Sequence, residues 1–141
     1  MKKLERFYPV HSHSFDTALS EIQSGSKRSH WMWYIFPQLR GLGSSPTAYI
    51  YGLSGLEEAQ AFAEDPILGC NLRRITQALL DQPKRNAFGI FGDIDALKLR
   101  SCMTLFDFIS PNDIFEQVLI KYYNGTRCSR TIKTLTLSVN K

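Results

Sequence analysis

The chain has 141 residues and a formal net charge of +4 at pH 7; 43% of its residues are hydrophobic and 21% are charged. This length suits one domain that buries a hydrophobic core of its own. No apolar run approaches the roughly 20 residues that span a bilayer, and the basic N-terminus lacks the apolar segment of a secretory signal, which excludes a membrane protein and predicts a cytoplasmic one.

The first third of the sequence predicts two helices and a loop. Ser14 can cap a helix over 14–23, which the serine and glycine that follow bring to an end. Ser29 can cap a second, short helix, and Pro37 stops it because proline disfavours helical backbone in the residue before it. The glycine-containing segment 38–44 is then expected to form a loop.

Three helices are predicted in the middle of the chain. Ser45, which a proline follows, is typical of an N-cap and opens a short helix that ends at Gly52. Ser54 and Glu57 match a capping box, in which a serine and a glutamate three residues later satisfy each other's backbone N–H groups. The Asp-Pro pair at 65–66 ends that helix and begins a longer one.

The last third of the chain predicts four more helical segments. A short turn over 88–91 precedes a longer helix that Asp93 or Asp95 can cap, and a Ser-Pro pair at 110–111 starts the next helix. A short helix over about 129–137 follows. Apolar residues recur at helical spacing, and no segment shows the sustained alternation that is typical of a strand.

These patterns predict an all-α fold, a single domain over 1–141 built as a compact bundle of about seven to nine short helices. The cysteines Cys70, Cys102 and Cys128 match neither a disulfide framework nor the close pairs of a zinc site. We therefore expect free, mostly buried thiols and no metal or cofactor. Basic residues are spread along the chain between carboxylates, which disfavours extended nucleic-acid binding but favours encounters with small anions or acidic proteins.

The most unusual segment spans residues 27–46, KRSHWMWYIFPQLRGLGSSP, and holds both tryptophans in a basic stretch. Its aromatic side chains point around much of a helical circumference, so some of them are expected to face a cleft. Trp31 and Trp33 lie about 200° apart on a helix. One of them is therefore expected to pack in the core, while the other can stack on a planar ligand.

Several polar residues of this segment suit recognition of an anion. Lys27 and Arg40 can hold a phosphate or a carboxylate, and the amide of Gln38 can both donate and accept. Gly43 and Ser45 belong to a loop that leads into a helix N-terminus, where free N–H groups favour an anion. The alternatives are solvated surface charges, a residue that braces a turn, and simple chain geometry.

Two residues are candidates for catalysis. His30 can act as a general acid or base because an imidazole titrates near neutral pH; a buried histidine bonded to a backbone carbonyl is the alternative. Asp95 can stabilise oxocarbenium character if the chemistry is glycosidic cleavage.

Asp95 also begins a polar helix face with Lys98, and Arg100 and Ser101 lie close by. This face can meet the aromatic segment across a cleft; the alternative is an exposed ion pair between Asp95 and Lys98. We expect His30 to lie within about 10 Å of Lys98 or Arg100, a scale set by ordinary ligand pockets.

Three blocks of the sequence, at 25–52, 65–74 and 95–106, resemble the bacterial domain family DUF1810, and the resemblance extends over nearly the whole chain. It implies a mainly α-helical single domain and no known activity. Members are sometimes labelled calpastatin-like, but a calpain inhibitor works as an extended disordered chain, whereas this sequence is patterned as a compact domain.

Two classes of function remain open. The first is an aromatic, basic pocket that either binds or both binds and hydrolyses a small nucleotide-like or ADP-ribose-like anion. The second is a protein-protein interaction module without catalytic activity, in which the same aromatic residues anchor a partner. A deep cleft between the two polar segments favours the first class, and a flat apolar patch favours the second.

Overall fold

The computed structural model describes residues 2–139 and confirms an all-helical fold; residue 1 and residues 140–141 of the expected domain lie outside the described part. In this part the chain forms nine α-helices and no strand, and an isolated bridge joins Leu39 to Leu53. The elements in chain order are a 3-10 helix (Lys2–Arg6), α1 (Phe7–Ser24), α2 (Met32–Ile35), α3 (Pro46–Tyr51), α4 (Leu56–Glu64), α5 (Leu68–Asp81), α6 (Ala87–Phe91), α7 (Asp93–Ile109), α8 (Ile114–Tyr123) and α9 (Ser129–Val139).

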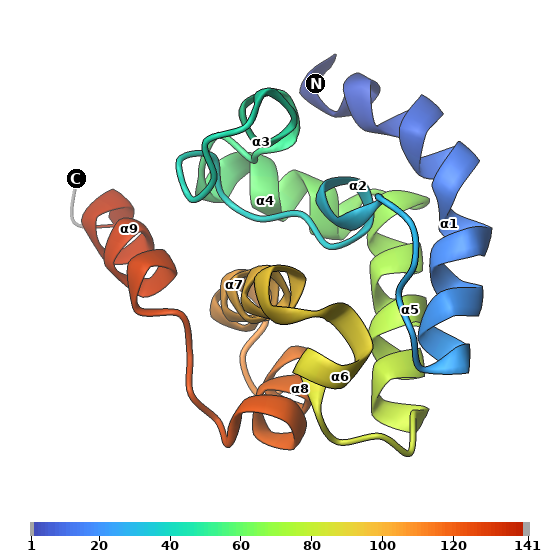
Figure 1. Ribbon diagram of the computed structural model, residues 1–141. Coiled ribbons are helices and arrows are strands. Elements are labelled where there is room, and N and C mark those ends of the chain that lie inside the picture. Colours follow the sequence, from blue (N-terminus) through green and yellow to red (C-terminus); the bar gives the residue numbers. More distant parts are fainter. Residues whose placement is uncertain (1, 140–141) are drawn as a thin grey trace.

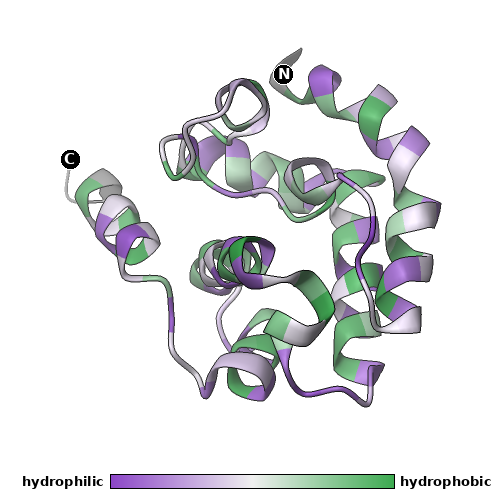
Figure 2. Ribbon diagram, in the orientation of Figure 1, coloured by the Kyte–Doolittle hydropathy of each residue, from purple (hydrophilic) through white to green (hydrophobic). Residues whose placement is uncertain are grey.

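Helix α7 is the centre of the arrangement. It packs against α4, α6, α8 and α9, while α1 and α5 lie side by side along one edge and run in the same direction (Figure 1). The hydrophobic residues of these helices join one core cluster, and much of the polar surface lies on their outer faces (Figure 2). No helix within 2–139 is both long and apolar enough to cross a membrane.

The first helix begins at Phe7, so the prediction that it starts at Ser14 is wrong. Pro9 lies in the first turn, where proline is tolerated because the N–H groups there have no partner inside the helix. The buried face simply continues upstream of Phe15 through Phe7 and His11. Because His11, a polar residue, belongs to that buried face, the apolar pattern before Phe15 was not recognised in the sequence.

Two of the predicted helix caps, at α2 and at α7, are also wrong. Ser29 does not cap α2, because Trp31 holds the cap position. The Ser29 hydroxyl donates to the buried carboxylate of Glu21 instead. Asp93 and Asp95 lie inside the first turn of α7, where Gly92 holds the cap position.

The capping box around Ser54 is shifted by one residue, since Glu58 rather than Glu57 accepts from the Ser54 backbone N–H, at 2.9 Å. At α8, Asp113 rather than the Ser-Pro pair provides the cap. The prediction for Ser45 is confirmed: its hydroxyl oxygen accepts from the backbone N–H of Ala48 at 3.0 Å.

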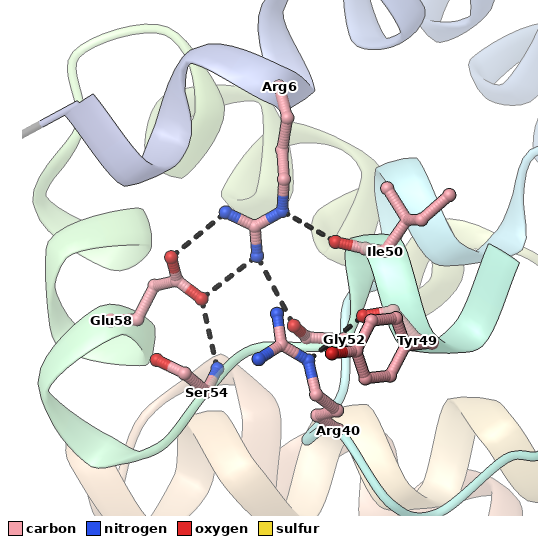
Figure 3. Close-up of polar contacts among 7 residues, drawn as sticks. All are labelled: Arg6, Arg40, Tyr49, Ile50, Gly52, Ser54 and Glu58. Carbon is pink, nitrogen blue, oxygen red and sulfur yellow. Dashed lines mark hydrogen bonds and ion pairs between the residues drawn. The ribbon is translucent and has the colours of Figure 1, made fainter. Parts of the chain in front are cut away.

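An arginine clamp fixes the start of α1 to the middle of the chain (Figure 3). The Arg6 guanidinium donates to both carboxylate oxygens of Glu58 at 2.9 Å, and also to the backbone carbonyls of Ile50 and Gly52. Burial alone raises the pKa of Glu58, but the bonds from Arg6 and Ser54 outweigh it and lower the pKa below its usual value. The clamp therefore holds the α3–α4 connection against the N-terminus.

Two helical glycines offer a matched test of the packing between α4 and α5. A Cβ atom on Gly69 would lie 2.1 Å from the carbonyl oxygen of Ala63, whereas one on Gly89 would meet nothing closer than 3.9 Å. We expect Gly69→Ala to lower the free energy of unfolding by roughly 2–3 kcal/mol, because backbone must move. Gly89→Ala should leave it unchanged or raise it by up to about 1 kcal/mol. Urea denaturation measures both, and equal midpoints for the two variants would contradict the packing described.

Candidate functional site

A buried carboxylate at the end of α1 organises the segment that leads to α2. Glu21 is 8% exposed and accepts four hydrogen bonds. They come from the backbone N–H groups of Arg28 and Ser29, at 2.8 and 3.1 Å, from the Ser29 hydroxyl at 2.6 Å and from the Trp31 indole N–H at 2.9 Å. Burial by itself raises the pKa of Glu21, but these bonds outweigh it and lower the pKa to about 2. The side chain is therefore a carboxylate at neutral pH.

The turn held by Glu21 places Lys27 beside the start of α7. The Lys27 side chain is only 6% exposed, and its ammonium lies 2.8 Å from one oxygen of Asp95 and over the ring of Trp31. Lys98 contacts the other oxygen of Asp95 at 3.3 Å. One carboxylate thus lies between two ammonium groups, so the group of three carries a net positive charge.

These residues line a cavity of about 300 Å³, here called the α2–α7 cavity. The segment before α2 and α2 itself form one side of it, and the start of α3 and the first two turns of α7 form the others. Its lining consists of Lys27, His30, Met32, Trp33, Tyr34, Ser45, Thr47, Asp95 and Lys98. Six residues singled out in the sequence therefore meet at one place: Lys27, His30, Trp33, Ser45, Asp95 and Lys98.

The aromatic residues that line the cavity are closely packed. Trp33 is 6% exposed, and a Cβ atom on Gly43 would lie 2.9 Å from its ring, so only glycine lets the loop pass so close to the indole. Lys98 lies over the Trp33 ring, with its ammonium 5.8 Å from the ring centre. Tyr34 is half-buried and packs edge-on against Tyr51, at 4.8 Å between ring centres.

His30 is exposed at the cavity, and within the described chain no hydrogen bond or ion pair to its side chain is found. The expected meeting of His30 with the Asp95–Lys98 face is thus seen in the structure. Its imidazole is free to contact a ligand. Its role as a general acid or base stays a prediction.

Three of the predicted binding residues of the aromatic segment lie away from the lining. Trp31 is 1% exposed and belongs to the core, with its N–H on Glu21. Gln38 is buried, and its backbone carbonyl accepts from the N–H of Leu53. Arg40 is exposed and donates to the carbonyl of Tyr49 beside the arginine clamp (Figure 3).

Arg100 and Ser101 on α7 do not line the cavity either. The Ser101 hydroxyl donates to the carbonyl of Leu97 at 3.2 Å and contacts the sulfur of Cys128 at 3.3 Å, on the side where α9 packs. Gly43, the fourth predicted residue of the aromatic segment outside the lining, packs closely against Trp33.

Sequence reasoning missed three lining residues and the carboxylate that supports them. Met32 and Tyr34 lie within the aromatic segment but were not distinguished from its core residues, and Thr47 follows the confirmed Ser45 cap by two positions. No local pattern marks Glu21, because its partners begin seven residues further along the chain.

No cluster of three or more histidine, cysteine or carboxylate side chains that could hold a metal ion is found among the described residues. All three cysteines are free; Cys102 and Cys128 are buried and Cys70 is exposed. Burial raises the pKa of the Cys102 thiol, which keeps it protonated.

Comparison with known proteins supplies a family and a fold. The family model described as "Protein of unknown function (DUF1810)" matches residues 1–135. The crystal structure of the conserved hypothetical protein Rv1873 from Mycobacterium tuberculosis is similar over 94% of this chain and 96% of that chain, with 44% sequence identity and a TM-score of 0.91. No curated protein matches the sequence. The described similarities name no ligand and no reaction.

The Glu21 network predicts a specific acid sensitivity. The pKa of Glu21 is lowered from 4.5 to about 2 in the folded protein, so the unfolded chain binds the proton first as the pH falls. Its stabilising contribution is therefore present above pH 4.5 and is lost between pH 4.5 and 2. We expect Glu21→Gln to lower the free energy of unfolding by about 2 kcal/mol at pH 7. The difference from the wild type should shrink towards pH 3.

Chemical denaturation at several pH values measures this difference. Glu57→Gln is the matched control, because Glu57 is an exposed residue of the first turn of α4. A deficit in Glu21→Gln that stays constant from pH 7 to pH 3 would show that the charge of this carboxylate is not what stabilises the turn.

Proposed function

Because this chain belongs to the DUF1810 family, whose description states no activity, we propose its function from its own cavity: the protein binds a small anionic molecule that carries a planar group, such as a nucleotide or a related ribose phosphate. The observation that carries this proposal is the pair of ammonium groups, on Lys27 and Lys98, that share the single carboxylate of Asp95 in the α2–α7 cavity.

The two lysines differ in how readily they can turn to a ligand. Lys27 is buried, and it is held by Asp95 at 2.8 Å and by the carbonyl of Ser29. Lys98 is 30% exposed, and its pair with Asp95, at 3.3 Å and three residues apart on one helix, is of a kind worth a few tenths of a kcal/mol. An oxyanion can therefore draw Lys98 away from Asp95 at little cost, while Lys27 keeps the carboxylate in place.

The remaining lining residues suit the rest of such a ligand. Tyr34 is half-buried and offers part of its ring, whereas Trp33 is too deeply buried to serve as a free stacking face and forms a wall instead. The hydroxyls of Ser45 and Thr47 can bond to phosphate or sugar oxygens. A planar group against Tyr34 gains the stacking energy that proteins use for bases.

The size of the cavity favours the smaller members of this ligand class. A volume of about 300 Å³ is at the lower limit of ordinary ligand pockets. It suits a mononucleotide or a sugar phosphate better than a complete ADP-ribose, whose second half would extend past His30 into solvent. We therefore rank the mononucleotide and ribose phosphate above ADP-ribose.

The arrangement supports binding more strongly than cleavage. Both oxygens of Asp95 contact ammonium groups, which places this carboxylate as a support for the lysines. If the site also hydrolyses its ligand, His30 is the side chain that is free to transfer a proton. Product analysis of any ligand that binds separates these two activities.

Binding can be tested by calorimetry with AMP, ribose 5-phosphate and ADP-ribose at low salt. We expect saturable binding that weakens as salt rises, because the contacts are ionic. Lys98→Gln should raise the Kd about tenfold, which corresponds to about 1.4 kcal/mol. Lys133→Gln is the matched control, since Lys133 is exposed on α9 and does not line the cavity; it should leave the Kd unchanged.

Failure of all three compounds to bind the folded protein would overturn this proposal. The interaction-module alternative would then be favoured, and the exposed apolar side chains of α7, Ile94 at 72% and Leu97 at 47%, would be its first candidates for a contact surface. Equal weakening by Lys98→Gln and Lys133→Gln would instead show that net charge, rather than the cavity, attracts the ligand.

A further inference from the structure

A second cavity, of about 420 Å³, lies between the parallel helices α1 and α5 and shares no lining residue with the α2–α7 cavity. We call it the α1–α5 cavity. From α1 come Tyr8, His11, Ser12, Phe15 and Asp16, and from the start of α5 and the turn before it come Ile67, Asn71 and Arg74. His11 and Phe15 are buried and lie deepest, whereas most of the other side chains stand at the rim.

His11 carries hydrogen-bonding groups that the described residues do not use. It is 2% exposed and stacks on the ring of Phe15, at 5.4 Å between centres and 13° between planes. No hydrogen bond to its imidazole is found within the described chain. Its ring nitrogens are not among the buried side-chain atoms of the described residues that lack a partner, so they are open to the cavity. An imidazole whose nitrogens open into a cavity can bond a ligand there.

The proton state of His11 agrees with that role. Burial lowers its pKa below the usual value, although the charge of Asp65 acts in the opposite direction. The ring is therefore neutral at pH 7, with one nitrogen that donates and one that accepts. Asp65 itself is occupied, since it accepts from the Tyr8 hydroxyl and from the backbone N–H groups of Ile67 and Leu68.

Arg74 presents the charge that a ligand would meet. Its guanidinium lies over the Phe15 ring, 5.1 Å from the ring centre, and its Nη1 donates to the side chain of Asn71 at 2.9 Å. Neither Nε nor Nη2 bonds to any of the described residues. These two groups form one edge of the guanidinium fork, and such an edge matches the two oxygens of a carboxylate.

Apolar surface completes the cavity. Phe15 forms the floor together with His11, and Tyr8 and Ile67 form the walls, with Ile67 56% exposed. Asp16 is exposed at the rim, so the cavity carries one cation from Arg74 and one anion from Asp16. This balance disfavours ligands with several negative charges, which suit the α2–α7 cavity instead.

We propose that the α1–α5 cavity binds a small monocarboxylic acid with a flat apolar body, whose carboxylate pairs with Arg74 and whose body covers Phe15 beside His11. The carboxylate or a polar substituent of the ligand takes up the unused hydrogen bond of His11. This inference does not depend on the function proposed for the α2–α7 cavity.

Benzoate is a suitable probe, and the imidazole signals of His11 in proton NMR spectra, assigned with His11→Phe, are the readout. We expect benzoate to shift these signals saturably, and benzyl alcohol, which lacks the charge, to shift them far less. Arg74→Gln should weaken binding at least tenfold. Arg85→Gln, at an exposed residue outside the cavity, is the matched control and should bind as the wild type does.

Further variants test whether benzoate binds at this cavity and through the guanidinium fork of Arg74. Lys98→Gln should leave benzoate binding intact, which separates this site from the first one. Unfolding midpoints verify that Arg74→Gln remains folded, and Arg74→Lys, which keeps the charge but loses the fork, should bind with intermediate affinity. No shift of the His11 signals at high benzoate concentration, or equal shifts in wild type and Arg74→Gln, would overturn the proposal.

Discussion

The structure of this protein depends on one buried carboxylate. Glu21 lies at the end of α1 and gathers four hydrogen bonds from a turn that has no regular secondary structure of its own. The turn reverses direction after Gly25, which ends α1 with a left-handed φ of 81° that glycine adopts at no steric cost. An isolated carboxylate would be costly to bury, but the donors around Glu21 are themselves groups that need an acceptor when buried. Because the carboxylate and its donors satisfy one another, the turn is fixed in one conformation.

The turn held by Glu21 determines the geometry of the candidate site. The hydrogen bond to Glu21 fixes the Trp31 ring, and the Lys27 ammonium lies over that ring. Lys27 also forms an ion pair with Asp95 on α7. Two helices that do not adjoin in sequence are thus connected through a chain of charged and aromatic groups. Lys27 and Asp95 are already held in the ligand-free protein, so the ligand proposed above would cost little conformational entropy to bind and would require only Lys98 to move.

The sequence predicted the local features well and the long-range ones poorly. The helical class, the Ser45 cap and the pairing of Asp95 with Lys98 follow from neighbours within four residues, and all are present. The start of α1 was missed because His11, a polar residue, occupies a core position. The burial of both tryptophans could not be predicted either, since Trp31 is bonded to Glu21, ten residues away, and Trp33 packs against Gly43, also ten residues away.

The same limit explains why the predicted site was broader than the cavity. Arg40 and Lys98 look alike in the sequence, as cations beside unusual polar segments. Their surroundings differ because Arg40 follows the bridge between Leu39 and Leu53, which turns its side chain towards Tyr49 and the arginine clamp. A single residue pair far apart in the sequence decides such an orientation, and no pattern of neighbours contains that information.

The parallel course of α1 and α5 has a consequence for how the molecule assembles. Contacts between them join residues about 60 positions apart, as in the bond from Gln82 to the carbonyl of Ile22, so forming them requires closure of a long loop. The antiparallel contacts of α7 with α8 are far more local and can form early. We therefore expect α1 to dock late during folding and to detach first in partial unfolding. Since Glu21 and His11 both belong to α1, a brief detachment of this one helix would dismantle both cavities while the rest of the core stayed intact.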